Sequence, residues 1–436
     1  MKILLSAYAC EPRKGSEPGV GWSAALLLSD EHDVWVLTRA NNRPAIEREL
    51  GRCPLPRLHF VYYDLPSWAR WWKRRRRGLQ LYYYLWQIGA YRIARRLHRE
   101  IGFDLVHHVT FGKYWAPSLL VQLPLPFVWG PVGGAESVPA AFWPDLGTRG
   151  ILFEAFREFA RWCGDHDPLV RFTVRRSRMA LAKAGETAEH LRRLGAREVR
   201  LFFCTQLLMA ETLRLIPGVT ATLDPPGGRD ALRFVSMGNL AHLKAFHLGL
   251  RAFARAGLEN AEYWIIGDGT DRRRLETEAR ALGIERRVRF WGQVPQEEAL
   301  RKLAEADVLV HPALHDSGGG PILEAMALGR AVICLDLGGP AVRVTDETGI
   351  KIPARHPRQV ERDLAEAMRR LTLDRDLLRQ MGRAGRQWSA RTHGPEEVAL
   401  QLNAIYRDAM VEWSAGHRYS DVSAVRESPS VRGPEA

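Results

Sequence analysis

Residues 308–340 (VLVHPALHDSGGGPILEAMALGRAVICLDLGGP) limit the folds open to this chain more than any other stretch. A short apolar run, Val308 to Val310, is followed by a glycine-rich loop and by an apolar helical pattern that ends at Gly329. Pro321 suits the start of a helix because its missing N–H has no partner there, and Gly329 suits the left-handed residue after the end. A second apolar run follows at Ala331. The stretch therefore predicts a strand, a loop, a helix and a second strand, the repeating unit of an α/β sheet.

The loop of this unit has the residues of an anion site. Gly318, Gly319 and Gly320 directly precede the helix, where backbone N–H groups lack helical partners and the absence of Cβ atoms lets an anion approach. Glu324 lies one turn into the helix, and its carboxylate can accept two hydrogen bonds from a vicinal diol such as that of ribose. The pattern fits a nucleotide. A tight turn and a glutamate that answers only the helix dipole would explain the same residues.

This stretch resembles the donor-site signature of the retaining glycosyltransferases of family 4. The shared features are a carboxylate (Asp316), seven intervening residues, Glu324 in an EAM-type helix, a small apolar strand and Gly-Gly-Pro. The resemblance implies the GT-B fold, an α/β architecture in which two Rossmann-like domains face a cleft. It also implies that Glu324 binds the donor ribose. Asp316, in a catalytic role, and the amides of Gly318–Gly320 would face the donor sugar and diphosphate. The first carboxylate of the signature is usually glutamate, so the shorter Asp316 departs from it.

The beginning of the chain contains a second glycine-rich segment. A strand is predicted at Lys2–Ala7 and a helix at Gly21–Leu28, with a loop over residues 15–21 between them. By the resemblance, Gly19 and Gly21 in this loop face the donor across the cleft; a plain tight turn is the alternative. The fragment GVGWSA also fits the dinucleotide fingerprint, which would indicate a nicotinamide-dependent oxidoreductase. However, about a dozen residues separate it from the strand, and no acidic residue closes the second strand.

Two histidines end another predicted strand of this region. Asp104–Val106 is the strand, and His107 and His108 follow it. Family 4 members commonly carry histidines here, near the donor sugar, so the resemblance makes both residues catalytic candidates that line the site. The usual order is His-x-His, and here Val109 takes the second place. Buried, hydrogen-bonded histidines would give the same sequence. The glycine-rich loop at residues 130–136 is expected to border the cleft.

The second half of the chain supplies further candidates for the donor site. Leu232–Met237 predicts a buried strand, which is followed by Asn239 and Lys244. In family 4 an arginine and a lysine at these places bind the donor diphosphate, so the resemblance assigns Lys244 to the phosphates, while Asn239 replaces the arginine. An exposed lysine in a first helical turn is the alternative. Val294 follows the strand predicted at Val288–Trp291, and the resemblance assigns the donor base to its backbone.

The charge of the chain indicates an anionic partner. Lys and Arg number 63 against 50 Asp and Glu, a formal net charge of +13. Residues 68–86 (WARWWKRRRRGLQLYYYLW) concentrate cations and aromatic side chains. Trp and Tyr beside clustered cations suit the surface of an anionic bilayer, although RNA would suit the same composition, as would a solvated basic loop beside core aromatics. A non-catalytic protein that binds a membrane surface or RNA is therefore a second alternative function.

Metal and membrane signals are weak. The five cysteines are widely spaced without a Cys-x-x-Cys pair, which predicts a reducing compartment and no zinc site. Asp165-His166-Asp167 fits an Asp-x-Asp metal motif, but it lies within a segment expected to be helical, Leu152–Ala184, so we expect helix capping instead. No apolar run approaches the roughly 20 residues needed to cross a bilayer. The opening MKILLSAYAC is too short in apolar residues for a lipoprotein signal and is expected to form a strand.

These observations predict two α/β domains. Residues 1–216 form an acceptor domain, 217–230 a linker and 231–395 a donor domain, while a helix at 396–413 packs back on the first domain and residues 414–436 are disordered. The predicted function is a retaining glycosyltransferase that uses a UDP- or GDP-linked donor and a glycan or lipid-linked acceptor in bacterial polysaccharide synthesis. No metal, other cofactor or nucleic acid is expected. The predicted location is cytoplasmic, including the inner face of the cell membrane as a peripheral protein.

Overall fold

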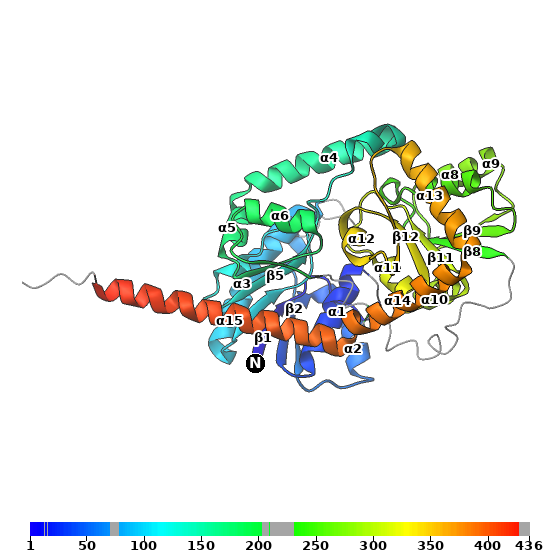
Figure 1. Ribbon diagram of the computed structural model, residues 1–436. Helices are drawn as coiled ribbons and strands as arrows, with labels where there is room; N and C mark the ends of the chain where they lie inside the picture. Colours follow the sequence, from blue (N-terminus) through cyan, green and yellow to red (C-terminus); the bar gives the residue numbers. More distant parts are fainter. Residues whose placement is uncertain (13, 15, 70–77, 203–208, 210–230, 427–436) are drawn as a thin grey trace, which may run out of the picture.

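The computed structural model describes residues 1–12, 14, 16–69, 78–202, 209 and 231–426, and within them the chain forms two β-sheets with helices packed against them (Figure 1). The predicted linker at 217–230 and the basic run at Lys73–Arg77 lie outside the described residues. Every pairing between the named strands is parallel. Parallel sheets are buried on both faces, and the apolar strands of this chain meet that requirement.

The first sheet has the strand order β3-β2-β1-β4-β5-β6-β7. Its strands are β1 (Lys2–Ser6), β2 (Asp33–Arg39), β3 (Leu58–Tyr63), β4 (Leu105–His108), β5 (Phe127–Val132), β6 (Met179–Ala182) and β7 (Val199–Leu201). Its helices are α1 (Ser16–Ser29), α2 (Arg43–Leu50), α3 (Leu79–Ile101), α4 (Gly147–His166), α5 (Pro168–Arg176) and α6 (Gly185–Arg193). Alternation along β1 sends Ile3 and Leu5 into the core beneath α1, and Leu4 into the core beneath α3.

The second sheet has the order β10-β9-β8-β11-β12-β13. Its strands are β8 (Leu232–Met237), β9 (Ala261–Ile266), β10 (Val288–Gly292), β11 (Val308–His311), β12 (Ala331–Leu335) and β13 (Gly349–Ile352). Its helices are α8 (Phe246–Ala256), α9 (Arg272–Ala281), α10 (Gln296–Glu305), α11 (Gly320–Ala327), α12 (Gly338–Arg343), α13 (Pro357–Leu373) and α14 (Arg375–His393). Strand order reverses between β1 and β4 and between β8 and β11, and such switch points are where ligands bind in open α/β sheets.

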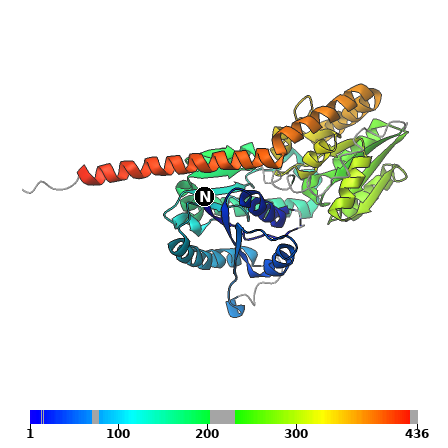
Figure 2. The ribbon, with the colours of Figure 1, turned by 90° about the horizontal axis from the view of Figure 1, so that it is seen from below.

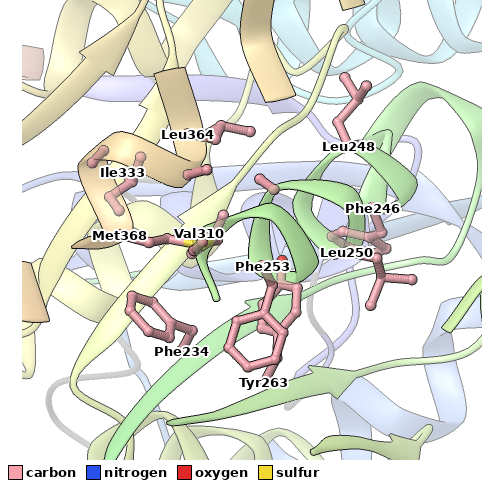
Figure 3. Packing of buried hydrophobic residues seen from close by; sticks show 14 of the residues in the cluster. Phe234, Phe246, Leu248, Leu250, Phe253, Tyr263, Val310, Ile333, Leu364 and Met368 are labelled. Atoms are coloured by element: carbon pink, nitrogen blue, oxygen red, sulfur yellow. The ribbon is translucent and has the colours of Figure 1, made fainter. Parts of the chain in front are cut away.

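The core of the second sheet joins α8 and α13 to one face of the strands. Figure 3 shows Phe234 of β8, Phe253 of α8 and Tyr263 of β9 turned toward one another. The ring centroids of Phe253 and Tyr263 are 5.5 Å apart. A Cβ at Gly249 would lie 2.3 Å from the Tyr263 hydroxyl, so glycine lets α8 approach the sheet this closely. Burial of each such aromatic or aliphatic side chain stabilises the folded state by about 1.5–3 kcal/mol.

The last helix, α15 (Pro395–Arg426), returns to the first domain. Val398, Leu402 and Tyr406 belong to the core cluster that lies beneath α1, and Figure 2 shows the helix running along that domain and extending beyond it. Residues 414–426, which were expected to be disordered, continue this helix. Within the described part of the chain, no helix is both long and apolar enough to cross a bilayer.

One segment was predicted with the wrong secondary structure. Residues 152–184 were expected to be helical throughout, but Met179–Ala182 forms the buried strand β6. A four-residue apolar run carries too little periodicity to separate a strand from a helix, so its place in the sheet decides its conformation. The strands β3 and β13 were not located from the sequence.

Candidate active site

Asp316 is the centre of the loop between β11 and α11. Its Oδ2 accepts hydrogen bonds from Lys244 Nζ at 2.6 Å and from His311 Nε2 at 2.9 Å. Its Oδ1 accepts from the backbone N–H groups of Gly318 and Gly319, both at 2.9 Å. Burial would raise the pKa of Asp316, but Lys244 and His311 outweigh burial and hold the pKa well below its usual value. Asp316 is therefore an ionised carboxylate that holds the loop and a lysine in place.

The glycine loop differs from the expected arrangement. The amides of Gly318 and Gly319 were expected to face a donor anion, but both donate to Asp316. The reason is local: a carboxylate two and three residues earlier in the chain can reach these amides. Gly319 has a left-handed conformation (φ 54°), and a Cβ there would lie 2.9 Å from Arg343 Nη1, so the loop requires glycine. Gly320 is the first residue of α11.

A second cation, which sequence reasoning missed, lies at the same loop. Arg343 at the end of α12 is buried and donates from Nη1 to the carbonyl oxygen of Gly318. Arginine is rarely buried without partners. The sequence could have revealed Arg343 through its position in the apolar run GGPAVRV. Together with Lys244, it lowers the pKa of His311, although burial lowers it most. The loop thus combines two cations and one carboxylate.

Glu324 and the loop before α10 lie close together, although they are far apart in sequence. Burial raises the pKa of Glu324 to about 7, and a hydrogen bond with the Gln296 side chain lowers it in part. Gln296 begins α10, two residues after Val294, which is partly buried. The carboxylate predicted to bind ribose therefore lies beside the loop predicted to bind the base. Asn239, exposed after β8, adjoins Gly269, where a Cβ would lie 2.6 Å from Asn239 Oδ1.

Gly19 and Gly21 are not in a loop, which corrects the prediction. Helix α1 begins at Ser16, and both glycines are buried inside it. A Cβ at Gly21 would lie 2.2 Å from the carbonyl oxygen of Ala9. The glycine therefore lets α1 pack on the chain that follows β1. It is Glu17, in the first turn of α1, that points toward the cleft: it accepts a hydrogen bond from the Gly112 amide at 2.8 Å.

His107 and His108 are also corrected, because the structure places them in the core. His107 bonds through Nδ1 to the Tyr406 hydroxyl (2.7 Å) and through Nε2 to the Gly130 carbonyl (2.8 Å). His108 bonds to Ser6 Oγ at 3.0 Å and to the Tyr83 hydroxyl at 3.2 Å. Burial lowers the pKa of His107 to about 4 and that of His108 to about 3. As the last residues of a central strand covered on both faces, they are neutral structural groups.

A cavity of about 950 Å³ lies between the two domains. The second domain contributes Ser317, the neighbour of Asp316, together with His315 and Leu243. The first domain contributes Glu17 and Lys183, whose Nζ donates to the Gly112 carbonyl at 3.3 Å. Gly133 and Gly134 also line it, as expected for the loop at residues 130–136. The cavity therefore adjoins the Asp316 loop at Ser317, and both domains contribute polar groups to it.

Contacts between the domains border this cavity. His315 Nε2 lies 3.6 Å from Glu136 Oε2, and His242 Nε2 lies 3.1 Å from Glu154 Oε1. Burial and Arg157 lower the pKa of His315, so it is neutral near pH 7. These histidines come from the second domain and the carboxylates from the first. The two domains thus meet through polar pairs directly beside the candidate site.

The possible metal motif has a structural role. Asp167 caps α5 by accepting from the Leu169 amide at 2.7 Å, as predicted. Asp165 accepts from the Tyr114 hydroxyl at 2.9 Å and from His190 Nε2 at 2.7 Å. Over the described ranges of the chain, no group of three or more His, Cys, Asp or Glu side chains could hold a metal ion.

Comparison with protein families identifies the second domain. Residues 228–388 match the family model for glycosyl transferases group 1. The lipopolysaccharide core biosynthesis glycosyltransferase LpsE of Rhizobium meliloti (strain 1021) is 36% identical over 142 residues, which is 32% of this chain and 40% of LpsE. The 2-deoxystreptamine N-acetyl-D-glucosaminyltransferase of Streptomyces fradiae is 26% identical over 310 residues, 68% of this chain and 67% of that protein.

Solved structures extend the likeness to both domains. Anabaena Alr3699/HepE in complex with UDP covers 93% of this chain and 99% of its own, with a TM-score of 0.60 and 16% identity. WaaG, a glycosyltransferase involved in lipopolysaccharide biosynthesis, covers 91% of this chain and 98% of its own, with a TM-score of 0.57 and 17% identity. The predicted GT-B fold and the resemblance to group 1 glycosyltransferases are confirmed; the narrower assignment to family 4 stays a prediction.

Proposed function

We propose that this chain is a retaining glycosyltransferase that moves a sugar from a nucleotide-sugar donor to a glycan or lipid-linked acceptor in polysaccharide synthesis. The observation that supports the proposal is the arrangement of the residues of the donor-site signature in the second domain. Asp316 holds Lys244 and the glycine loop at the switch point of the second sheet, and Glu324 lies beside Gln296 in the same domain. The names of LpsE and WaaG support polysaccharide synthesis as the setting.

In the proposed reaction, the second domain binds the donor and the first domain admits the acceptor. Glu324 accepts hydrogen bonds from the donor ribose, and the backbone near Val294 contacts the base. As the bond between sugar and phosphate breaks, negative charge develops on the diphosphate, and fixed cations stabilise such charge in a cleft that excludes water. Lys244 and Arg343 are the cations at this loop. The acceptor enters from the first domain, past Glu17 and Lys183.

The donor class can be tested directly. HepE has been solved with UDP and with UDP-glucose, so we infer a UDP-linked donor first and a GDP-linked donor second. In a thermal-shift panel of UDP-sugars, GDP-mannose, NAD and NADP, at least one nucleotide sugar should raise the melting temperature, and the nicotinamides should not. Stabilisation by a nicotinamide alone would overturn the proposal. The oxidoreductase alternative is already weakened, because GVGWSA lies inside α1 instead of forming a phosphate-binding turn.

We infer peripheral contact with an anionic membrane from fewer residues than the sequence suggested. Trp68 is exposed, but Tyr82, Tyr83 and Trp86 are fully buried, so these aromatics cannot meet a bilayer or RNA. What remains is the exposed Trp68, together with Trp71, Trp72 and the cations at 73–77, and the residues from 70 to 77 lie outside the described part of the chain. Attraction near 1 kcal/mol for each basic residue is expected. Vesicles containing anionic lipid should sediment the protein at low salt, and replacement of Arg74–Arg77 by serine should abolish this; equal sedimentation would refute the inference.

A further inference from the structure

Helix α4 presents its large apolar side chains to the outside. Phe153 is 53% exposed, Phe156 69%, Phe159 59% and Trp162 57%. The residues of α4 that are buried are Gly150, Glu154 and Gly164. A surface helix normally buries its apolar stripe and exposes its charges, so this pattern is reversed. Contiguous exposed apolar surface of this kind marks a binding site.

Three members of this row line the cavity that adjoins the Asp316 loop at Ser317. Phe153, Phe156 and Phe159 border the same 950 Å³ space as Lys183 and Ser317. Leu152, on the same helix and 71% exposed, does not line the cavity. The row thus extends into the cavity beside the Asp316 loop and is not only an outer surface patch.

The row also has a direction. At one end the ring of Phe153 lies 5.3 Å from that of His242, two residues before Lys244. At the other end Phe159 stacks on Trp162 at 6.1 Å, and Trp162 lies 4.6 Å from the His166 ring. From residue 153 to 162 a helix rises roughly 14 Å. An aromatic surface therefore leads from the segment that carries His242 and Lys244 to the outside of the molecule.

We propose that the acceptor is an amphiphile whose hydrocarbon chain lies along the aromatic row Phe153, Phe156, Phe159 and Trp162, with its sugar hydroxyl held in the cavity near Lys183 and Ser317. This assignment rests on the proposed glycosyltransferase function and names its acceptor class. A linear apolar chain fits because Phe153, Phe156 and Phe159 all border the cavity. Steps of three residues turn the row around the helix by about 60° each, so that it leads from the cavity to the exposed Trp162. A flat bilayer would contact the exposed side chains of the helix, but it would not fill the cavity that Phe153, Phe156 and Phe159 line.

The experiment compares acceptor analogues that differ only in the chain. Methyl and n-octyl glycosides of glucose, galactose, mannose and N-acetylglucosamine, below micelle-forming concentrations and with UDP present, are titrated by calorimetry. For at least one sugar the octyl form should bind about tenfold or more tightly than the methyl form. Phe156→Ser should remove most of this preference and leave UDP affinity unchanged. Leu152→Ser, the matched control on the same helix, should keep the preference.

Three results would overturn the proposal. Equal binding of octyl and methyl glycosides is the first, and an equal loss in Leu152→Ser and Phe156→Ser is the second. The third is association through Phe156 with vesicles, or with a second copy in analytical ultracentrifugation, without any octyl preference in solution. Nucleotide-sugar binding is measured on the same preparation. A protein that binds no nucleotide sugar refutes the proposed function, whereas one that binds it without an octyl preference refutes only the acceptor class.

Discussion

The two domains place histidines at equivalent positions and use them differently. His108 ends β4 and His311 ends β11, and each strand adjoins the first strand of its sheet at the switch point. His311 bonds to Asp316 in the loop that follows. His108 bonds back to Ser6 of the neighbouring strand and to Tyr83 of α3. The position of a histidine at a strand end therefore does not by itself place it in the site. The loop that follows the strand must also supply a polar side chain that bonds to the histidine.

The electrostatics of the two positions differ in the same way. Burial lowers the pKa of all three histidines. Around His107 and His108 the hydrogen-bond partners are neutral, whereas His311 has a carboxylate, a lysine and an arginine nearby. The charged groups we assign to the donor diphosphate belong to the second domain. The first domain supplies most of the cavity lining, including Glu17, Lys183 and the three phenylalanines of the aromatic row.

Among the substitutions that test this comparison, Asp316→Ala should have the largest effect on stability and donor affinity. Removing the carboxylate leaves Lys244 and His311 without their shared partner and frees the amides of Gly318 and Gly319. Breaking a buried pair in this way costs roughly 3 kcal/mol of stability, and donor affinity should fall about 100-fold because the loop loses its shape. Urea unfolding and donor titration measure the two quantities. Wild-type donor affinity in a folded Asp316→Ala protein would show that the loop does not depend on this carboxylate.

Lys244→Met should have the next largest effect. Loss of one charge-assisted hydrogen bond to the diphosphate, about 1.5–3 kcal/mol, weakens donor binding roughly 10- to 100-fold.

Excess EDTA should change neither donor affinity nor transfer in the wild type. Abolition of transfer by EDTA, with rescue by magnesium or manganese, would mean that the protein's own cations do not suffice.

Donor affinity should also depend on pH through Glu324. Its pKa is raised to about 7 by burial, and ribose hydroxyls are best accepted by the ionised form. Because protonation competes with binding, affinity should fall about tenfold as pH decreases from 8 to 6. The pKa values of Asp316 and His311 are both lowered, so these groups stay in one state over this range. Calorimetry with Glu324→Gln should give a flat profile; an unchanged slope in that variant would assign the titration elsewhere.

His107→Asn should have the smallest effect on the donor. Losing hydrogen bonds to Tyr406 and Gly130 should lower the free energy of unfolding by about 2–4 kcal/mol, while donor affinity stays within twofold. Tyr406→Phe, which removes only the hydroxyl, should cost about half as much. If a His107 variant unfolds like the wild type but binds donor poorly, His107 contributes to donor binding and not only to stability.

The sequence was most informative where a local motif specifies its own conformation. The stretch from β11 to β12 folds as its glycines, Pro321 and apolar runs predict, because turn and capping preferences act within a few residues. Gly19, Gly21 and the two histidines were misplaced because their roles depend on contacts with Ala9, Gly130 and Tyr406, which are distant in sequence or invisible to periodicity.

The residues that were missed share one property. Arg343, Glu17 and Lys183 reach the site only because the chain brings separate strand ends together, and no motif assigns a role to any of them. The aromatic row of α4 was visible as a spacing of three residues, but the spacing alone reads as a buried stripe. Only its exposure and its place in the cavity reveal a binding surface.

The central claim is that the second domain holds the donor through Glu324, while the histidines of the first domain hold the fold. Titration of the nucleotide sugar found in the panel into Glu324→Gln and His107→Asn, side by side, tests it most directly. We expect Glu324→Gln to bind roughly 10- to 100-fold more weakly, and His107→Asn to bind as the wild type does. Wild-type affinity in a correctly folded Glu324→Gln protein, or a greater loss in His107→Asn, would contradict the account.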